Sequence, residues 1–184
     1  MRRHFSETEK INRGENHHME NIQELYHVSD EVIEQPDLAH SSQAYEFGRG
    51  FYLFRDREDA LEFAQDRGLD VLNVYKFDPE KAQITASVTL EPEPRKWLDY
   101  VTLHYIDEDT PFGTVEEFFE EADVTIVEGN GVSMQLLPAL SKFAVGGSEE
   151  SVVERARALH LPLVVMIRKE AALAAITFDH AEEI

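Results

Sequence analysis

The chain has 184 residues, and its 17 Lys and Arg residues stand against 37 Asp and Glu residues, which gives a formal charge of −20. The length suits one domain, and a hydrophobic fraction of 42% is typical of globular proteins and excludes a wholly disordered chain. So acidic a protein repels phosphate backbones and anionic lipid headgroups, which disfavours general nucleic-acid binding and docking on a membrane.

The sequence contains no cysteine, which excludes a disulfide framework, an iron–sulfur cluster, a thiolate zinc site and a cysteine nucleophile. Its apolar runs are shorter than the roughly 20 residues needed to span a bilayer, and residues 1–19 lack the apolar core of a secretory signal. We therefore expect a cytoplasmic protein with a disordered leader over 1–19 and one domain over 20–184. A second interpretation of the leader is an extension upstream of a start at Met19.

The first half of the expected domain begins with an apolar run over 22–28, which predicts a strand, followed by a polar loop over 29–44. Residues 47–54 are glycine-rich and then aromatic, a pattern typical of a turn that leads into an extended segment. A helix is expected over 56–67, with Asp56 as its N-cap and a glycine at position 68 that ends it.

Further strands are predicted where apolar and β-branched residues alternate or cluster. These lie at 71–77, 84–90, 123–127, 163–167 and 176–178. Helices are predicted from Pro94 onward and at 134–143, 148–160 and 170–175. Strands and helices do not alternate regularly, so the sequence predicts an α+β fold rather than a doubly wound sheet.

Two segments carry residues suited to ligand binding: 25–29 (Leu-Tyr-His-Val-Ser) and 47–53 (Phe-Gly-Arg-Gly-Phe-Tyr-Leu). A histidine at a strand end can present a ring nitrogen to a polar ligand, and His27 holds that position. Gly48 and Gly50 permit a positive φ or a close approach of the backbone to a ligand.

Phe51 and Tyr52 are consecutive, so one ring can face the core while the other faces a cleft. With His27 and the glycine turn they would supply an aromatic platform, a hydrogen-bonding ring and exposed backbone amides. That combination suits a flat, amide-bearing ring attached to a sugar.

The strand Leu-Tyr-His-x-Ser and the following Phe-Gly-x-Gly-Phe-Tyr segment resemble the NAD-binding core of the ADP-ribosyltransferase superfamily, in its diphtheria-toxin-like and poly-ADP-ribose-polymerase-like branch. The pattern of that branch is His-Gly-Ser/Thr followed by Gly-x-Gly-x-Tyr. Several other segments resemble a bacterial family of unknown function that is ADP-ribosyltransferase-like in sequence. They are 51–53 with the helix that follows, 73–77, 97–101 and 123–127. The resemblance covers about residues 22–178.

The resemblance implies a split pair of β-sheets with peripheral helices and an NAD cleft between the sheets. His27 would hydrogen-bond a ribose hydroxyl, the backbone of Val28 would hold the nicotinamide carboxamide, and Tyr52 would stack on the nicotinamide ring. His27 and Tyr52 are thus the candidate catalytic residues. The candidate NAD-binding residues are His27, Val28, Ser29, Gly48, Arg49, Gly50, Phe51 and Tyr52. Arg49, Arg55 and Arg57 could offset the two phosphates of NAD, or they are ordinary loop and helix-start charges.

The implied reaction is cleavage of the N-glycosidic bond of NAD through an oxocarbenium-like state, followed by attack of a macromolecular acceptor or of water. Val28 stands where the family has glycine, and residues 161–167 carry no polar residue where a late-strand glutamate is usual. His160, Glu170 and Glu128 are the nearest candidates for that third position.

The leading hypothesis is therefore an NAD-dependent ADP-ribosyltransferase-like protein, which transfers ADP-ribose to a macromolecule or hydrolyses NAD. The alternative is a catalytically inactive member of that fold that acts as a binding module. A third hypothesis, an acidic protein that binds a basic partner or mimics a nucleic acid, rests on the charge alone. The histidines show no spacing typical of metal ligands, so no metal is expected.

Overall fold

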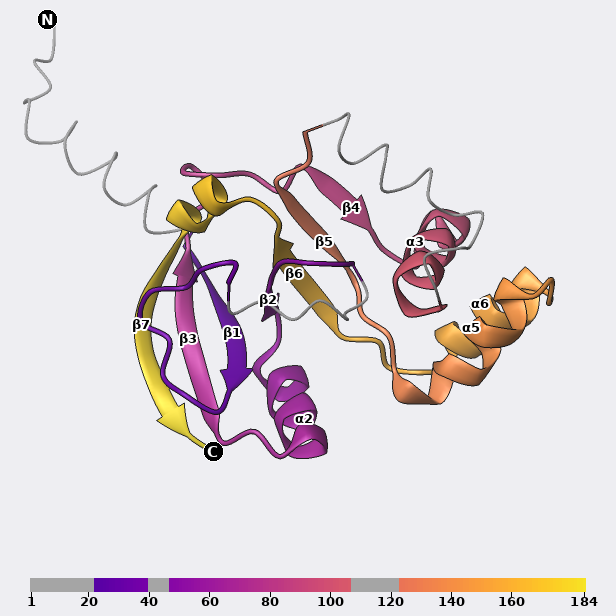
Figure 1. Ribbon diagram of the computed structural model, residues 1–184, viewed down its shortest axis with the longest axis horizontal. Coiled ribbons are helices and arrows are strands. Elements are labelled where there is room, and N and C mark those ends of the chain that lie inside the picture. The colour runs from indigo at the N-terminus through magenta and orange to yellow at the C-terminus, as the bar shows by residue number, and fades with distance from the viewer. Residues whose placement is uncertain (1–21, 40–46, 107–122) are drawn as a thin grey trace, which may run out of the picture.

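The computed structural model describes residues 22–39, 47–106 and 123–184, and for residues 103–106 it describes the backbone only. The predicted leader over 1–19 and part of the predicted loop over 29–44 lie outside the described residues. The described chain forms a mixed α/β fold around one seven-stranded mixed sheet (Figure 1). Within these ranges, none of the helices is both long enough and apolar enough to cross a bilayer.

The strands are β1 Gln23–Ser29, β2 Phe51–Phe54, β3 Val71–Phe77, β4 Ala86–Val88, β5 Ile126–Asn130, β6 Leu163–Ile167 and β7 Ile176–Glu183. Their order across the sheet is β4-β5-β6-β2-β1-β3-β7. The β4–β5 pair is parallel and the other neighbouring pairs are antiparallel.

The pairing between neighbouring strands is shortest between β1 and β2. β1 pairs with β3 along its whole length, from Gln23↔Phe77 to Ser29↔Val71, but with β2 only at Tyr26↔Phe54. The two strands therefore diverge beyond this single pair, and they divide the sheet into a β4-β5-β6-β2 part and a β1-β3-β7 part, which Figure 1 shows on its right and left. The described residues form one sheet, so the split pair of sheets that the resemblance implies is not confirmed.

The helices are α2 Arg57–Arg67, α3 Pro94–Ile106, α5 Leu137–Ala144 and α6 Glu149–Arg157, with 3-10 turns η1 Met134–Leu136 and η2 Glu170–Ala175. The prediction for α2 is confirmed, because the Asp56 carboxylate accepts a hydrogen bond from the Glu58 backbone N–H at 2.7 Å. Gly68 then ends the helix in the left-handed conformation, at a φ of 68°.

Several predicted boundaries differ from the structure, among them those of the strands expected over 84–90 and 123–127, which are Ala86–Val88 and Ile126–Asn130. The helix expected over 134–143 is divided into η1 and α5, with a proline in the first turn of α5. The helix expected over 148–160 ends at Arg157, shortly before Pro162. The strand expected over 176–178 extends to Glu183, because the charged residues after 178 lie on an edge strand, where side chains meet water.

Two hydrophobic clusters cover the two faces of the sheet, because successive side chains of a strand point to opposite faces. The larger cluster includes Val28 and Phe54 from the sheet and Trp97 from α3, together with residues of α2, α5 and α6. The smaller cluster includes Leu25 and Phe51 and is covered by η2. The short pairing between β1 and β2 thus lies between two separate cores.

Candidate functional site

His27 bridges the divergence of β1 and β2. Its Nδ1 lies 2.8 Å from the backbone carbonyl oxygen of Tyr52, and since a carbonyl only accepts, the Nδ1–H is the donor. Burial lowers the pKa of His27, and the hydrogen bond to Tyr52 opposes this only in part. The ring is therefore neutral near pH 7, and its Nε2 carries a lone pair that can accept a hydrogen bond.

The imidazole is also held by stacking. Its centroid lies 4.5 Å from that of Phe51, with 22° between the planes. Phe51 in turn meets Tyr75 edge to face, with centroids 5.8 Å apart. Offset-stacked and edge-to-face pairs are both favourable arrangements, so the orientation of His27 is fixed by a ring contact and a hydrogen bond.

Tyr52 closes the glycine turn through its hydroxyl group. The hydroxyl donates to the carbonyl oxygen of Gly48 at 2.6 Å and accepts from the backbone N–H of Phe47 at 3.0 Å. Gly48 has a φ of 80°, a conformation that suits glycine. The phenol is therefore anchored at its tip, and what it can offer a ligand is the face of its ring.

The rings of His27 and Tyr52 pack on different cores. His27 stacks on Phe51, which belongs to the smaller core, whereas Tyr52 packs against the larger core. The imidazole meets the backbone of Tyr52 rather than its phenol. Both residues nevertheless line one small cavity of about 70 Å³, together with Val28 and Phe54. We call this cavity, completed by Phe63, Val132, Pro162 and Val164, the inner recess.

The other predicted binding residues are divided between this site and the scaffold. Ser29 donates a hydrogen bond to the carbonyl oxygen of Glu31 at 2.7 Å, so its hydroxyl serves the loop after β1. A Cβ on Gly50 would lie 2.4 Å from the side chain of Met166, so this glycine is explained by the packing of β2 on β6. Arg49 lies on the turn and donates to the carbonyl oxygen of Leu38 at 3.4 Å.

Arg55 and Arg57 are used within the molecule. Arg55 Nε donates to Glu128 at 2.7 Å, and the same guanidinium also bonds Gln23. Arg57 forms an ion pair of 2.5 Å with Glu182 on β7. The interpretation of these two arginines as phosphate ligands is therefore not supported by their contacts, which are those of ordinary structural charges.

Each of the three candidates for the third catalytic position also has a partner. Glu128 on β5 is bound by Arg55. Glu170 accepts a hydrogen bond of 3.4 Å from the backbone N–H of Leu38, and the Nε2 of His160 lies 2.7 Å from Asp59. β2 and β6 lie between β1 and β5 in the sheet. Glu128 on β5 is therefore three strand spacings from His27 on β1, roughly 14 Å at the usual spacing.

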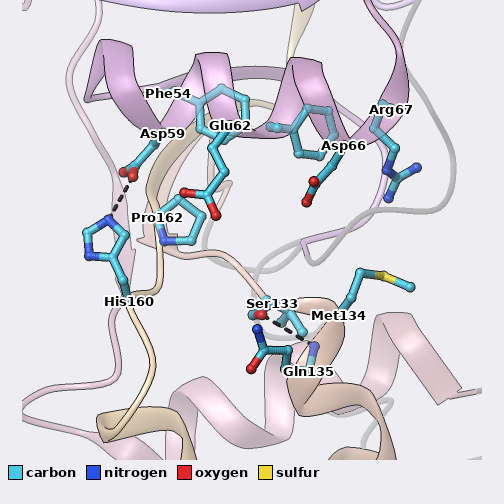
Figure 2. A pocket seen from close by; sticks show the side chains of 12 residues that line it. Phe54, Asp59, Glu62, Asp66, Arg67, Ser133, Met134, Gln135, His160 and Pro162 are labelled. Carbon is cyan, nitrogen blue, oxygen red and sulfur yellow. Dashed lines mark hydrogen bonds and ion pairs between the residues drawn. The ribbon is translucent and has the colours of Figure 1, made fainter.

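A larger outer cavity of about 550 Å³ is adjacent to the inner recess, and it shares with it Phe54, Phe63, Val132 and Pro162. Figure 2 shows α2 on one side of it and the segment with Ser133, Met134 and Gln135 on the other. The described residues hold no group of three or more His, Asp or Glu side chains suited to a metal ion.

Sequence reasoning missed two polar features of this region. Asn73 is fully buried on β3, where its amide accepts from Ile33 N–H at 2.8 Å and donates to Ser29 and to Glu31, so that it holds the loop after β1. A polar residue at a core position of an alternating strand was the available signal. The pair of Asp59 and His160 left no such signal, because 101 positions separate the two residues.

Of three comparisons with known proteins, the one with family models gives a match. A search of curated proteins finds no match, and a search of solved structures finds none either. One family model matches residues 23–178, from the first residue of β1 into β7, and so covers most of the chain. The chain therefore belongs to the family described as Protein of unknown function (DUF3990).

Proposed function

We propose that this protein binds NAD at the junction of β1 and β2, with the nicotinamide ring in the inner recess. The observation that carries the proposal is that His27 and Tyr52 both line the inner recess, and that the imidazole of His27 is neutral and oriented by the Tyr52 carbonyl. Its Nε2 would accept a hydrogen bond from a ribose hydroxyl. The ring of Tyr52, anchored through its hydroxyl, would offer a face to the nicotinamide, a contact worth about 1 kcal/mol.

The charges around the recess constrain the rest of the dinucleotide. Asp59, Glu62 and Asp66 line the outer cavity, so a diphosphate would be repelled there. The glycine turn offers the opposite sign, because Arg49 lies on it and forms no ion pair with a carboxylate among the described residues. We therefore place the diphosphate of bound NAD toward the turn rather than in the outer cavity.

The reaction that follows from this binding mode is the one implied by the family resemblance. The bond between the nicotinamide nitrogen and the ribose carbon breaks, nicotinamide leaves with the bonding electrons, and a nucleophile attacks the sugar carbon. The nucleophile is water or a group on a macromolecule, whose proton passes to solvent. Such a cation-like state is usually stabilised by a nearby carboxylate.

A second candidate function is favoured by the contacts of the three possible acids. Glu128, Glu170 and His160 are all bound to other groups, and none of them lines the inner recess. A protein that binds NAD without cleaving it, and so acts as a catalytically inactive module, is consistent with this arrangement.

Two measurements on purified protein test both candidates. Calorimetric titration with NAD reports binding, and chromatography of the same mixture after incubation reports free nicotinamide. We expect saturable binding by the natural protein and a loss of at least tenfold in affinity for His27→Ala. The matched control is His180→Ala, since His180 lies half-exposed on β7 and should leave binding unchanged.

The outcomes separate the alternatives. Nicotinamide release that depends on His27 supports the enzyme, and saturable binding without release supports the inactive module. The absence of both, or equal effects of the His27 and His180 substitutions, would overturn the proposed NAD site.

A further inference from the structure

We infer that the outer cavity is a binding site for a small organic cation, a protonated amine or amidine carried on an apolar body. The inference does not rest on the proposed function, because it depends on the residues of the outer cavity rather than on His27 or Tyr52. Its volume of about 550 Å³ lies in the usual range for small-molecule pockets.

The floor of the cavity is apolar. Phe54, Phe63, Val132 and Pro162 line both the outer cavity and the inner recess, so the two cavities are adjacent. Phe63 carries the guanidinium of Arg67 over its ring at 5.1 Å. Apolar area of this kind gains about 25 cal/mol for each Å² covered, which favours a ligand with a hydrocarbon or single-ring body.

The side of the cavity that α2 forms is acidic. Asp59, Glu62 and Asp66 follow one another at intervals of three and four residues, and they therefore share one side of the helix. Figure 2 shows the carboxylates of Glu62 and Asp66 directed away from the α2 ribbon toward the segment with Ser133 and Gln135, and that of Asp59 directed toward His160.

The carboxylate of Asp59 is only 9% exposed and is covered by the imidazole of His160, which is itself 76% exposed. Glu62 and Asp66 form no hydrogen bond or ion pair with another described side chain. The carboxylates of Glu62 and Asp66 thus have no ion-pair partner among the described side chains, and they can pair with a cationic ligand.

The combination specifies the ligand class. The carboxylates of Asp59, Glu62 and Asp66 outnumber the cationic groups of Arg67 and His160 in the lining, which disfavours an anion, and a neutral apolar molecule would leave Glu62 and Asp66 without a partner. A polycation without an apolar body would not use the aromatic floor. One positive charge on a short apolar body satisfies both surfaces, with the charge near Glu62 and Asp66 and the body over Phe54, Val132 and Pro162.

The test compares two probes that differ in charge. Phenethylamine is protonated at pH 7.5, whereas 2-phenylethanol has the same body with a hydroxyl group. Titration of each into the full-length protein, followed by calorimetry at low salt, should give saturable binding of the amine and at least tenfold weaker binding of the alcohol. Glu62→Gln and Asp66→Asn should each weaken amine binding about three- to fivefold, as expected for a partly exposed ion pair.

Matched controls keep the result specific. Glu58 also lies on α2, is exposed and does not line the cavity, so Glu58→Gln should leave amine affinity unchanged, and circular dichroism checks that each variant is folded. His27→Ala should weaken NAD binding at least tenfold without weakening amine binding, which separates this inference from the proposed function. Equal affinity of amine and alcohol, equal effects at Glu58 and Glu62, or no saturable amine binding would overturn the inference.

Discussion

The imidazole of His27 shows how one partly buried side chain couples the candidate site to the stability of the fold. Burial lowers its pKa from the ordinary value of 6.5, so the folded protein resists a proton that the unfolded chain accepts. The stability contributed by the neutral ring is complete above the unfolded value. It is lost as the pH falls from about 6.5 through the lower pKa of the folded state.

Urea unfolding curves measured at a series of pH values test this contribution of His27 to stability. The difference in free energy of unfolding between the natural protein and His27→Gln should change between pH 7.5 and pH 5.5, with acidification costing the natural protein more than the variant. His180 has the opposite sign, because hydrogen bonds to Asp179 and Glu182 raise its pKa, so its stabilisation is present at low pH and lost as the pH rises. His180→Gln should therefore change the pH dependence of the unfolding free energy in the direction opposite to that of His27→Gln. A parallel pH dependence for the natural protein and His27→Gln would contradict the assignment.

The hydroxyl of Tyr52 gives a second residue-scale prediction. Tyr52→Phe removes the partner of the Phe47 N–H and of the Gly48 carbonyl, and should lower the free energy of unfolding by about 1–3 kcal/mol. Tyr26→Phe is the matched control, since its hydroxyl contacts only the exposed carboxylate of Glu24. Urea unfolding measures both, and an equal loss for the two variants would show that the glycine turn does not depend on Tyr52.

At the scale of elements, the sequence predicted what local signals determine. The capped helix α2 was confirmed because Asp56 and Gly68 mark its ends independently of the rest of the fold. The full length of β7 was missed, because its second half is stabilised by pairing with β3 and carries charged residues.

The candidate site was predicted only in part, for the same reason. The motifs gave His27 and Tyr52, but alternation along β2 puts Phe51, not Tyr52, beside the imidazole. The outer cavity brings residues 59–67 to residues 132–135 and 160–162, and no local pattern encodes that meeting.

The cap of α2 gives the element-scale prediction. Asp56→Ala removes the acceptor for the Glu58 N–H and should cost about 1 kcal/mol of unfolding free energy, whereas Asp56→Asn keeps an acceptor and should cost much less. Because α2 carries the acidic side of the outer cavity, the alanine variant should also show faster amide hydrogen exchange in residues 58–60. Equal stability of the two variants would indicate that the cap does not hold this helix.

At the scale of the whole molecule, the dominant property is the net charge of −20. Charge far from zero destabilises a compact state through self-repulsion, and salt screens it over a Debye length of about 10 Å at 0.1 M. The ion pairs of the described residues act in the opposite direction, but most of them involve exposed side chains, which contribute little.

Thermal unfolding as a function of salt tests which effect is larger. Raising sodium chloride from about 20 mM to about 500 mM should raise the melting temperature by several degrees, with most of the rise below 0.2 M. A melting temperature that falls with salt would mean that attractive ion pairs outweigh the repulsion among the excess carboxylates.

We propose that NAD binds where β1 and β2 diverge, with the Nε2 of His27 as a hydrogen-bond acceptor. Nitrogen-15 spectra of the histidine side chains, recorded during an NAD titration at pH 7.5, report on this atom directly. The account predicts that the Nε2 signal of His27 shifts saturably with the pattern of a neutral ring protonated at Nδ1, while the signals of His160 and His180 stay in place. A His27 signal that does not move at saturating NAD, or that shows a doubly protonated ring, would contradict it.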